Sequence, residues 1–96
     1  MSITKILIER KIKPGTEKEF RRLMREVLSG AAHAHGFISG ETLQSVDDPC
    51  LHVTISQWKD LQSWTDWINS DERKKKQQEY DKILAEPMKV VALHYE

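Results

Sequence analysis

The segment VTISQWKDLQSWTDWINSDER, residues 53–73, decides the fold that we expect for this chain. Apolar and polar residues alternate up to Trp58, as in a strand, and a helical pattern with Trp64 and Trp67 follows almost at once. All three tryptophans of the 96-residue chain lie in this segment. Large aromatic side chains bury much surface and also stack on flat ligands. The strand-to-helix junction is therefore either core or the wall of a pocket, and both interpretations stay open.

A short helix is predicted at about residues 60–69. Its apolar stripe contains Leu61, Trp64 and Ile68, with Trp67 at the edge of the stripe. A second helix is predicted after Ser70, because serine is a good N-cap and acidic residues follow it. The rest of that helix, RKKKQQEYDKIL, is polar, and we interpret its lysines as a solvated face.

The residues before the central segment predict a strand, a helix and a hairpin. Residues 3–13 alternate, with Ile6, Ile8 and Ile12 on one face, and the Pro-Gly pair at 14–15 ends that run. Thr16 and Glu19 form a capping-box pair, and Gly36 is placed to end the helix. Two further strands, at 37–46 and 50–57, are joined by the DDP turn at 47–49. The helical stripe comprises Phe20, Leu23, Met24, Val27, Leu28 and Ala31.

With a last strand at 88–95, the order β-α-β-β-α-β predicts one α+β domain, residues 1–96, with a ferredoxin-like fold. Both helical regions then cover one face of an antiparallel sheet. The other face needs shielding, and a second copy packed sheet to sheet would supply it, so we expect a homodimer. Which side chains of each strand face the helices stays open, because a one-residue shift reverses them all. Apolar residues expected near the open face are Leu7, Leu43, Val91, Leu93 and Tyr95.

Charge and composition exclude several classes of function. Fifteen basic and fifteen acidic residues cancel, so no overall field favours nucleic acid or an anionic membrane. No stretch approaches the ~20 apolar residues of a membrane span, and charges interrupt the N-terminal apolar run, so we expect a cytoplasmic protein. Cys50 is the only cysteine, which excludes an intrachain disulfide.

The turns and the tryptophan segment carry a family resemblance. Pro-Gly at 14–15, Gly-Phe at 36–37, DDP at 47–49, TISQW at 54–58 and WTDWINSDER at 64–73 occur in an order that resembles the antibiotic biosynthesis monooxygenase (ABM) family, within the dimeric α+β barrel group. The resemblance spans residues 3–95. It implies a pocket between helices and sheet, with Trp67 matching a tryptophan that lies near the substrate in polyketide oxygenases and in haem degraders.

The chain departs from the family at three polar positions. Haem-degrading members carry an iron-ligating histidine where this chain has Gln77, and an asparagine where it has Ile8. Polyketide oxygenases place an asparagine one helical turn before the tryptophan, where this chain has Ser63. The resemblance therefore implies an oxygenase-like site with a different set of polar groups.

The residues support chemistry without a cofactor. An electron-rich aromatic substrate can itself reduce dioxygen if the protein binds the ring, stabilises its anion and excludes water. Trp67, Ser63 and His52 are the candidate catalytic residues, with His94 as another titratable strand residue. The candidate substrate-binding residues are Trp64, Phe37, Ile6, Ile8, Val53 and Tyr80.

No metal site or cofactor is predicted. His33 and His35 are two residues apart at a helix end and point in different directions, and phosphate-binding loops are missing from the sequence. Three hypotheses follow. The chain is a small dimeric oxygenase acting on an aromatic or quinol-type molecule, a non-catalytic or stress-response module that binds a small hydrophobic ligand, or a haem-binding relative with altered ligation.

Overall fold

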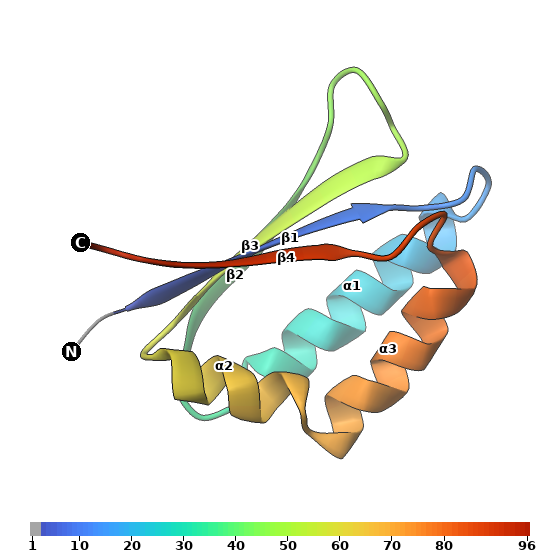
Figure 1. Cartoon of the computed structure of the whole chain (residues 1–96). Helices are drawn as coiled ribbons and strands as arrows, with labels where there is room; N and C mark the ends of the chain where they lie inside the picture. The colour runs from blue at the N-terminus through green and yellow to red at the C-terminus, as the bar shows by residue number, and fades with distance from the viewer. Residues whose placement is uncertain (1–2) are drawn as a thin grey trace.

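A computed structural model describes residues 3–96, and Figure 1 shows three helices on one face of a four-stranded sheet. The sheet order is β2-β3-β1-β4, and all neighbouring strands are antiparallel. The predicted ferredoxin-like α+β fold is confirmed, with its second helical region split in two. In chain order the elements are β1 (Thr4–Lys11), α1 (Glu17–Ala31), β2 (Phe37–Gln44), β3 (Leu51–Trp58), α2 (Leu61–Ile68), α3 (Asp71–Ile83) and β4 (Lys89–His94).

The register of β1 fixes which face of the sheet the helices cover. Ile6, Ile8 and Ile12 are at most 5% exposed, so the predicted apolar face of this strand is the covered one. Ile6 pairs with Ser56 of β3 and Ile8 pairs with Thr54. Since paired residues share a face, the even-numbered residues of β3 also point toward the helices.

The other face carries an apolar stripe that nothing in the chain covers. Leu7 pairs with Ile55 on one side and with Val91 on the other, and Leu43 pairs with Val53. Leu43 and Val91 are 51% and 47% exposed. The stripe therefore crosses all four strands on the face opposite the helices.

The first helix begins differently from the prediction. The capping box is wrong: Thr16 has φ −107° and ψ 13°, whereas an N-cap residue needs an extended backbone. Its hydroxyl instead donates to the carbonyl of Lys13 at 2.6 Å, and Glu19 pairs with Arg22. The helix ends at Ala31, and Gly36, with φ +82°, makes the turn into β2.

Both later helices have side-chain N-caps. Asp60 accepts a hydrogen bond from the amide of Ser63 at 2.8 Å, and Ser70 accepts one from the amide of Arg73 at 3.2 Å. The buried face of α2 differs from the predicted one, however. Trp67 is its buried tryptophan at 9% exposure, whereas Leu61 is 51% exposed. Trp67 packs with Ile6, Ile8 and Trp58 in the core.

The layer between sheet and helices contains two groups of buried residues. The packed half lies between β1, α1 and α3 and comprises Ile12, Phe20, Leu23, Tyr80, Ile83 and Leu84. The tryptophan half lies beside α2 and comprises Ile6, Ile8, Ala31, Trp58 and Trp67. None of the helices in residues 3–96 combines the length and apolar character needed to cross a bilayer.

Candidate functional site

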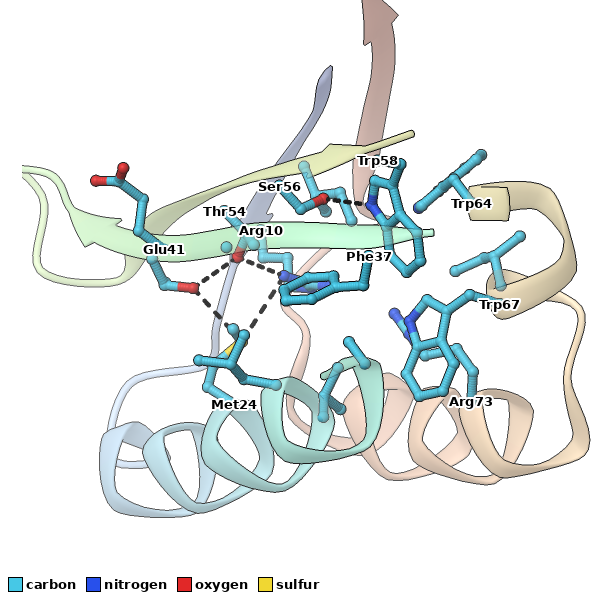
Figure 2. Close-up of a pocket in the computed structure, with 17 residues that line it drawn as sticks. Arg10, Met24, Phe37, Glu41, Thr54, Ser56, Trp58, Trp64, Trp67 and Arg73 are labelled. Atoms are coloured by element: carbon cyan, nitrogen blue, oxygen red, sulfur yellow. Dashed lines mark hydrogen bonds between the residues drawn. The ribbon is translucent and has the colours of Figure 1, made fainter. Parts of the chain in front are cut away.

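A slot opens in the tryptophan half, between the covered face of the sheet and helices α1 and α2 (Figure 2). Its inner surface is mostly apolar and aromatic, with a polar end formed by two arginines and three hydroxyl side chains. The lining residues are Ile8, Arg10, Met24, Val27, Leu28, Ala31, Phe37, Gly40, Glu41, Thr42, Thr54, Ser56, Trp58, Trp64, Trp67, Ile68 and Arg73.

The slot is narrow. It contains about 530 Å³ of space not filled by atoms, counted out to its mouth, but only about 60 Å³ can hold the centre of a water molecule. Most of the open space therefore lies within one water radius of a wall. That accessible volume is below the roughly 300–1,000 Å³ of typical small-molecule sites. Binding of an aromatic ring would therefore require side chains of the lining to shift, and a thin, flat molecule would require the smallest shift.

Three aromatic rings border the slot. Phe37 and Trp58 meet edge to face with centroids 5.2 Å apart, and the Trp58 indole donates to Ser56 Oγ at 3.0 Å. Trp58 is 1% exposed and therefore a fixed part of the wall. Trp67 enters from α2 and approaches Gly30 of α1 so closely that a Cβ there would lie 3.0 Å from its ring. A side chain at Gly30 would crowd Trp67 and, more closely, the carboxylate of Glu72.

Ser63 holds α2 in place and does not line the slot. Its hydroxyl donates to Asp60 at 2.7 Å, and a Cβ at Gly36 would lie 2.2 Å from that oxygen. Ser63 contributes to a separate surface hollow, which also includes Trp67 and His33. The prediction that Ser63 lies with Trp67 in the main site is corrected, because this serine packs against the turn before β2.

The polar end of the slot begins on the sheet. Arg10 of β1 donates through Nη1 to Thr54 Oγ1 at 3.0 Å, and the hydroxyls of Thr54 and Thr42 share a hydrogen bond at 2.9 Å. Arg10 is 2% exposed, and burial lowers its pKa to about 10. A guanidinium with that pKa stays charged at neutral pH. Figure 2 shows it beside the aromatic wall.

A second arginine reaches the slot from the first turn of α3. Arg73 is 2% exposed and donates through Nη1 to Gln77 Oε1 at 3.1 Å. Burial is also the main cause that lowers its pKa. Tyr80 lies behind both arginines: their guanidinium carbons are 4.5 and 5.4 Å from the centroid of its ring. The two positive charges thus share one aromatic neighbour.

The structure brings four of the sequence-predicted site residues together in the slot, namely Trp64, Trp67, Phe37 and Ile8. Ile6 lies under the same core, fully buried, but does not line the slot. Val53 is on the wrong face: it pairs with Glu9 and Leu43, on the surface opposite the helices. Its predicted place in the apolar floor is corrected, because β3 presents its even-numbered residues to the helices.

Neither predicted histidine nor Tyr80 lines the slot. His52 stacks on Phe20 with centroids 4.4 Å apart, and burial lowers its pKa. His94 ends the exposed strand β4. The Tyr80 hydroxyl donates to Met24 Sδ at 2.9 Å, and burial raises its pKa, so it is neutral at pH 7. These three side chains are therefore not bases acting inside the slot.

Comparison with known proteins identifies the family. The family model described as antibiotic biosynthesis monooxygenase (ABM) matches residues 4–79, which is most of the chain. The chain belongs to the ABM family. No curated protein matches its sequence.

Solved structures share the ABM fold at low sequence identity. A conserved protein from Methanosarcina mazei Go1 superimposes with a TM-score of 0.93 at 20% identity, covering 100% of this chain and 95% of that one. A proposed antibiotic biosynthesis monooxygenase from Nitrosomonas europaea superimposes with a TM-score of 0.90 at 18% identity, and the match covers 97% of this chain and 89% of that one. SnoaB, a cofactor-independent oxygenase from Streptomyces nogalater, superimposes with a TM-score of 0.90 at 12% identity, and the match covers 100% of this chain and 95% of SnoaB. At these identities the similarity establishes the fold.

The slot of this ABM chain does not fit haem. Its lining contains no histidine, cysteine or tyrosine, and the thioether of Met24 already accepts the Tyr80 hydroxyl. Gln77, at the position where haem degraders have their ligand, is bonded to Arg73 and Asp81. Among residues 3–96, no group of three or more histidine, cysteine, aspartate or glutamate side chains is arranged to hold a metal ion.

The sequence analysis missed the polar end of the slot. Arg10 alternates with Ile8 and Ile12 on the face of the strand that the helices cover, and this spacing could have indicated its burial. Its charge instead favoured a position in solvent. Arg73 lies in a strongly polar helix whose lysines are interpreted as a solvated face, and nothing in its sequence predicted its burial. Trp58 was treated as the end of a strand, although it is the most buried tryptophan.

Proposed function

We propose that this ABM-family chain is a small cofactor-independent oxygenase that acts on a flat aromatic or quinol-type molecule bound in the slot. The observation that supports it best is the unfilled space bordered by Trp64 and Trp67. Protein interiors are normally close-packed. A slot kept open beside large aromatic rings, in a family named for monooxygenation, fits a ligand site.

The proposed chemistry places the electron source in the substrate. A deprotonated phenol passes one electron to dioxygen, and the ring radical and superoxide combine to give a hydroperoxide at a ring carbon. The peroxide takes up the proton that the phenol lost, and the ring carbon, which bore one hydrogen, then loses water and becomes a carbonyl, so one oxygen atom enters the product and the other leaves as water. The protein binds the ring, stabilises the anion and excludes bulk water.

Oxygen uptake with a panel of hydroquinones tests this proposal. We expect oxygen uptake above the buffer rate for the wild type. Trp67→Phe should lower the rate of uptake at least about tenfold, which corresponds to about 1.4 kcal/mol of lost transition-state stabilisation. Tyr95→Phe is the matched control, because Tyr95 is an exposed aromatic outside the slot. Uptake that never exceeds the buffer rate with any quinol would refute the enzymatic proposal.

A ligand-binding module is the second candidate. One observation favours it: the only carboxylate in the lining is that of Glu41, which is exposed and points away from the slot in Figure 2. The lining therefore supplies no side chain placed as a general base. Saturable binding of a quinol without oxygen uptake would select this function over catalysis.

We also infer that the uncovered sheet face pairs with a second copy of the chain. The apolar stripe through Leu7, Ile55 and Val91 supports a sheet-to-sheet contact. Light scattering coupled to size exclusion should give about twice 11.2 kDa for the wild type. Val91→Glu should give the monomer mass, whereas Val46→Glu, in a turn and 99% exposed, should not. A monomeric wild type would contradict the inference.

A further inference from the structure

Two buried positive charges in the slot have no negative partner. Arg10 and Arg73 are each 2% exposed. None of the ion pairs formed within residues 3–96 includes either side chain. Buried arginines normally pair with a carboxylate, because an unpaired charge loses its hydration without compensation. An arrangement that leaves both unpaired needs a physical reason.

Their hydrogen bonding is also incomplete. Arg10 Nε and Arg73 Nη2 are buried and have no acceptor among the described residues. Arg10 uses Nη1 on Thr54, and Arg73 uses Nη1 on Gln77, whose amide donates onward to Asp81 at 2.9 Å. Asp81 thus forms no ion pair with Arg73, although its negative charge partly opposes the lowering of the Arg73 pKa by burial. A guanidinium has five N–H donors, so each arginine keeps donating capacity that the protein does not use.

Both arginines are part of the slot wall, and their charges add there. They lie over the same ring, that of Tyr80, and the charge of Arg73 contributes to lowering the pKa of Arg10. The Tyr80 hydroxyl is neutral and donates to Met24, so it does not offset them. A negatively charged oxygen entering the slot would be attracted to both guanidinium groups and would meet free N–H donors.

We propose that the slot binds its aromatic ligand as an anion, whose carboxylate or ring oxyanion accepts hydrogen bonds from Arg10 and Arg73. The proposal rests on the slot being the ligand site, as in the proposed function, and adds the class of ligand. The two positive charges would also lower the pKa of a ring hydroxyl bound beside them, so that its proton could pass to water without a basic side chain in the lining. A flat anion with its ring between Phe37 and Trp67 and its charged oxygen at the arginines matches both ends of the slot.

Naphthoate and its neutral amide, naphthamide, test the proposal because they share a shape and differ in charge. Isothermal titration calorimetry on the full chain should show the acid binding at least about tenfold more tightly, as expected for charge-assisted hydrogen bonds. Arg10→Met and Arg73→Met should each remove most of that preference for the acid over the amide. Lys75→Met, which removes an exposed charge from α3, should keep the preference.

Thermal unfolding of the same variants separates a binding role from a structural one. Replacing an unpaired buried charge with an apolar side chain of similar length should leave the melting temperature unchanged or raise it. If Arg10→Met does not fold, the test uses Arg73→Met, which lies in α3 and not in β1.

The outcomes distinguish the two proposals. Equal binding of acid and amide by the wild type would overturn the anion proposal alone. A preference for the acid that survives in a folded arginine variant would also overturn it. If neither probe binds and no quinol promotes oxygen uptake, both this proposal and the proposed function fail. Tight binding of naphthoate without oxygen uptake would support the anion proposal in a binding module.

Discussion

The packed half and the tryptophan half lie between the same sheet and the same helix, yet only one of them is filled. On α1, Phe20 and Leu23 project into the packed half, where the rings of Phe20 and Tyr80 are 6.1 Å apart. Two turns later the same helix presents Val27 and Ala31, and β2 presents Gly40. Small residues therefore stand where large ones occupy the other half. The small side chains of Val27 and Ala31 and the glycine at position 40 contribute to the open space of the slot.

Arg10 and Arg73 mark the boundary between the two halves. Each contacts Tyr80, which belongs to the packed half, and each lines the slot. An empty space and two unpaired charges are both costs to folding. Their coincidence at one end of the core is typical of a site that is completed by a ligand.

Two matched truncations, one in β1 and one at the residue after it, test the comparison with the largest expected effect. Ile12 belongs to the packed half and Ile8 borders the slot, on the same face of the strand. We expect Ile12→Ala to lower the free energy of unfolding by about 4 kcal/mol and Ile8→Ala by about 2 kcal/mol, near the two ends of the range for such truncations. Ile8 loses less because it already lacks partner atoms on one side.

Urea denaturation of both variants in parallel measures this difference. Equal losses, or a larger loss for Ile8→Ala, would mean that the two halves are packed alike and that the slot closes in solution.

The sequence predicted the architecture because alternation, helical stripes and turn residues are local signals. It also placed Trp67 in the site, through the resemblance carried by WTDWINSDER. The main gap in the prediction was which side chains of each strand face the helices. His52 and Val53 are neighbours on β3, and only the pairing of Ile8 with Thr54 shows which of them faces the helices. Pairing is a long-range property that one strand's sequence does not contain.

The buried arginines could not be predicted for a different reason. Charge is the strongest sequence argument for exposure, and Arg10 follows Glu9 in a strand with charged ends. The burial of Arg10 depends on α1 and α3 covering this part of β1, and that of Arg73 depends on the break between α2 and α3. Both are properties of packing between elements.

Tyr80→Phe tests a medium-sized effect in the packed half. The ring is fully buried, and its hydroxyl donates to Met24 Sδ, so the variant keeps the packing and loses one hydrogen bond. We expect a loss of about 1 kcal/mol in the free energy of unfolding and unchanged oxygen uptake, because Tyr80 does not line the slot. A strong fall in uptake at unchanged stability would instead make Tyr80 part of the site.

The smallest expected effect is a pH dependence in the packed half. Burial lowers the pKa of His52 below its ordinary value of 6.5. The charges of Arg10 and Arg21 lower this pKa further, and the charge of Glu17 partly raises it. The unfolded chain then binds the proton more readily, so this contribution to stability is complete above pH 6.5 and is lost as the pH falls toward the folded-state pKa.

Denaturation curves at about pH 7.5 and about pH 5.5 measure this contribution. His52→Gln should lose less stability than the wild type between these values, whereas His33→Gln, which alters an exposed histidine, should behave like the wild type. The same pH dependence in His52→Gln and wild type would refute the assignment.

The central claim is that the tryptophan half is a ligand slot and the packed half is not. All three indole groups line the slot, and each gives its own N–H signal in a ¹H–¹⁵N correlation spectrum. During a titration with naphthoate, we expect the indole signals to shift saturably while the methyl signals of Ile12 and Leu23 stay in place. Unmoved indole signals at saturating naphthoate, or shifts spread evenly over both halves, would contradict the account.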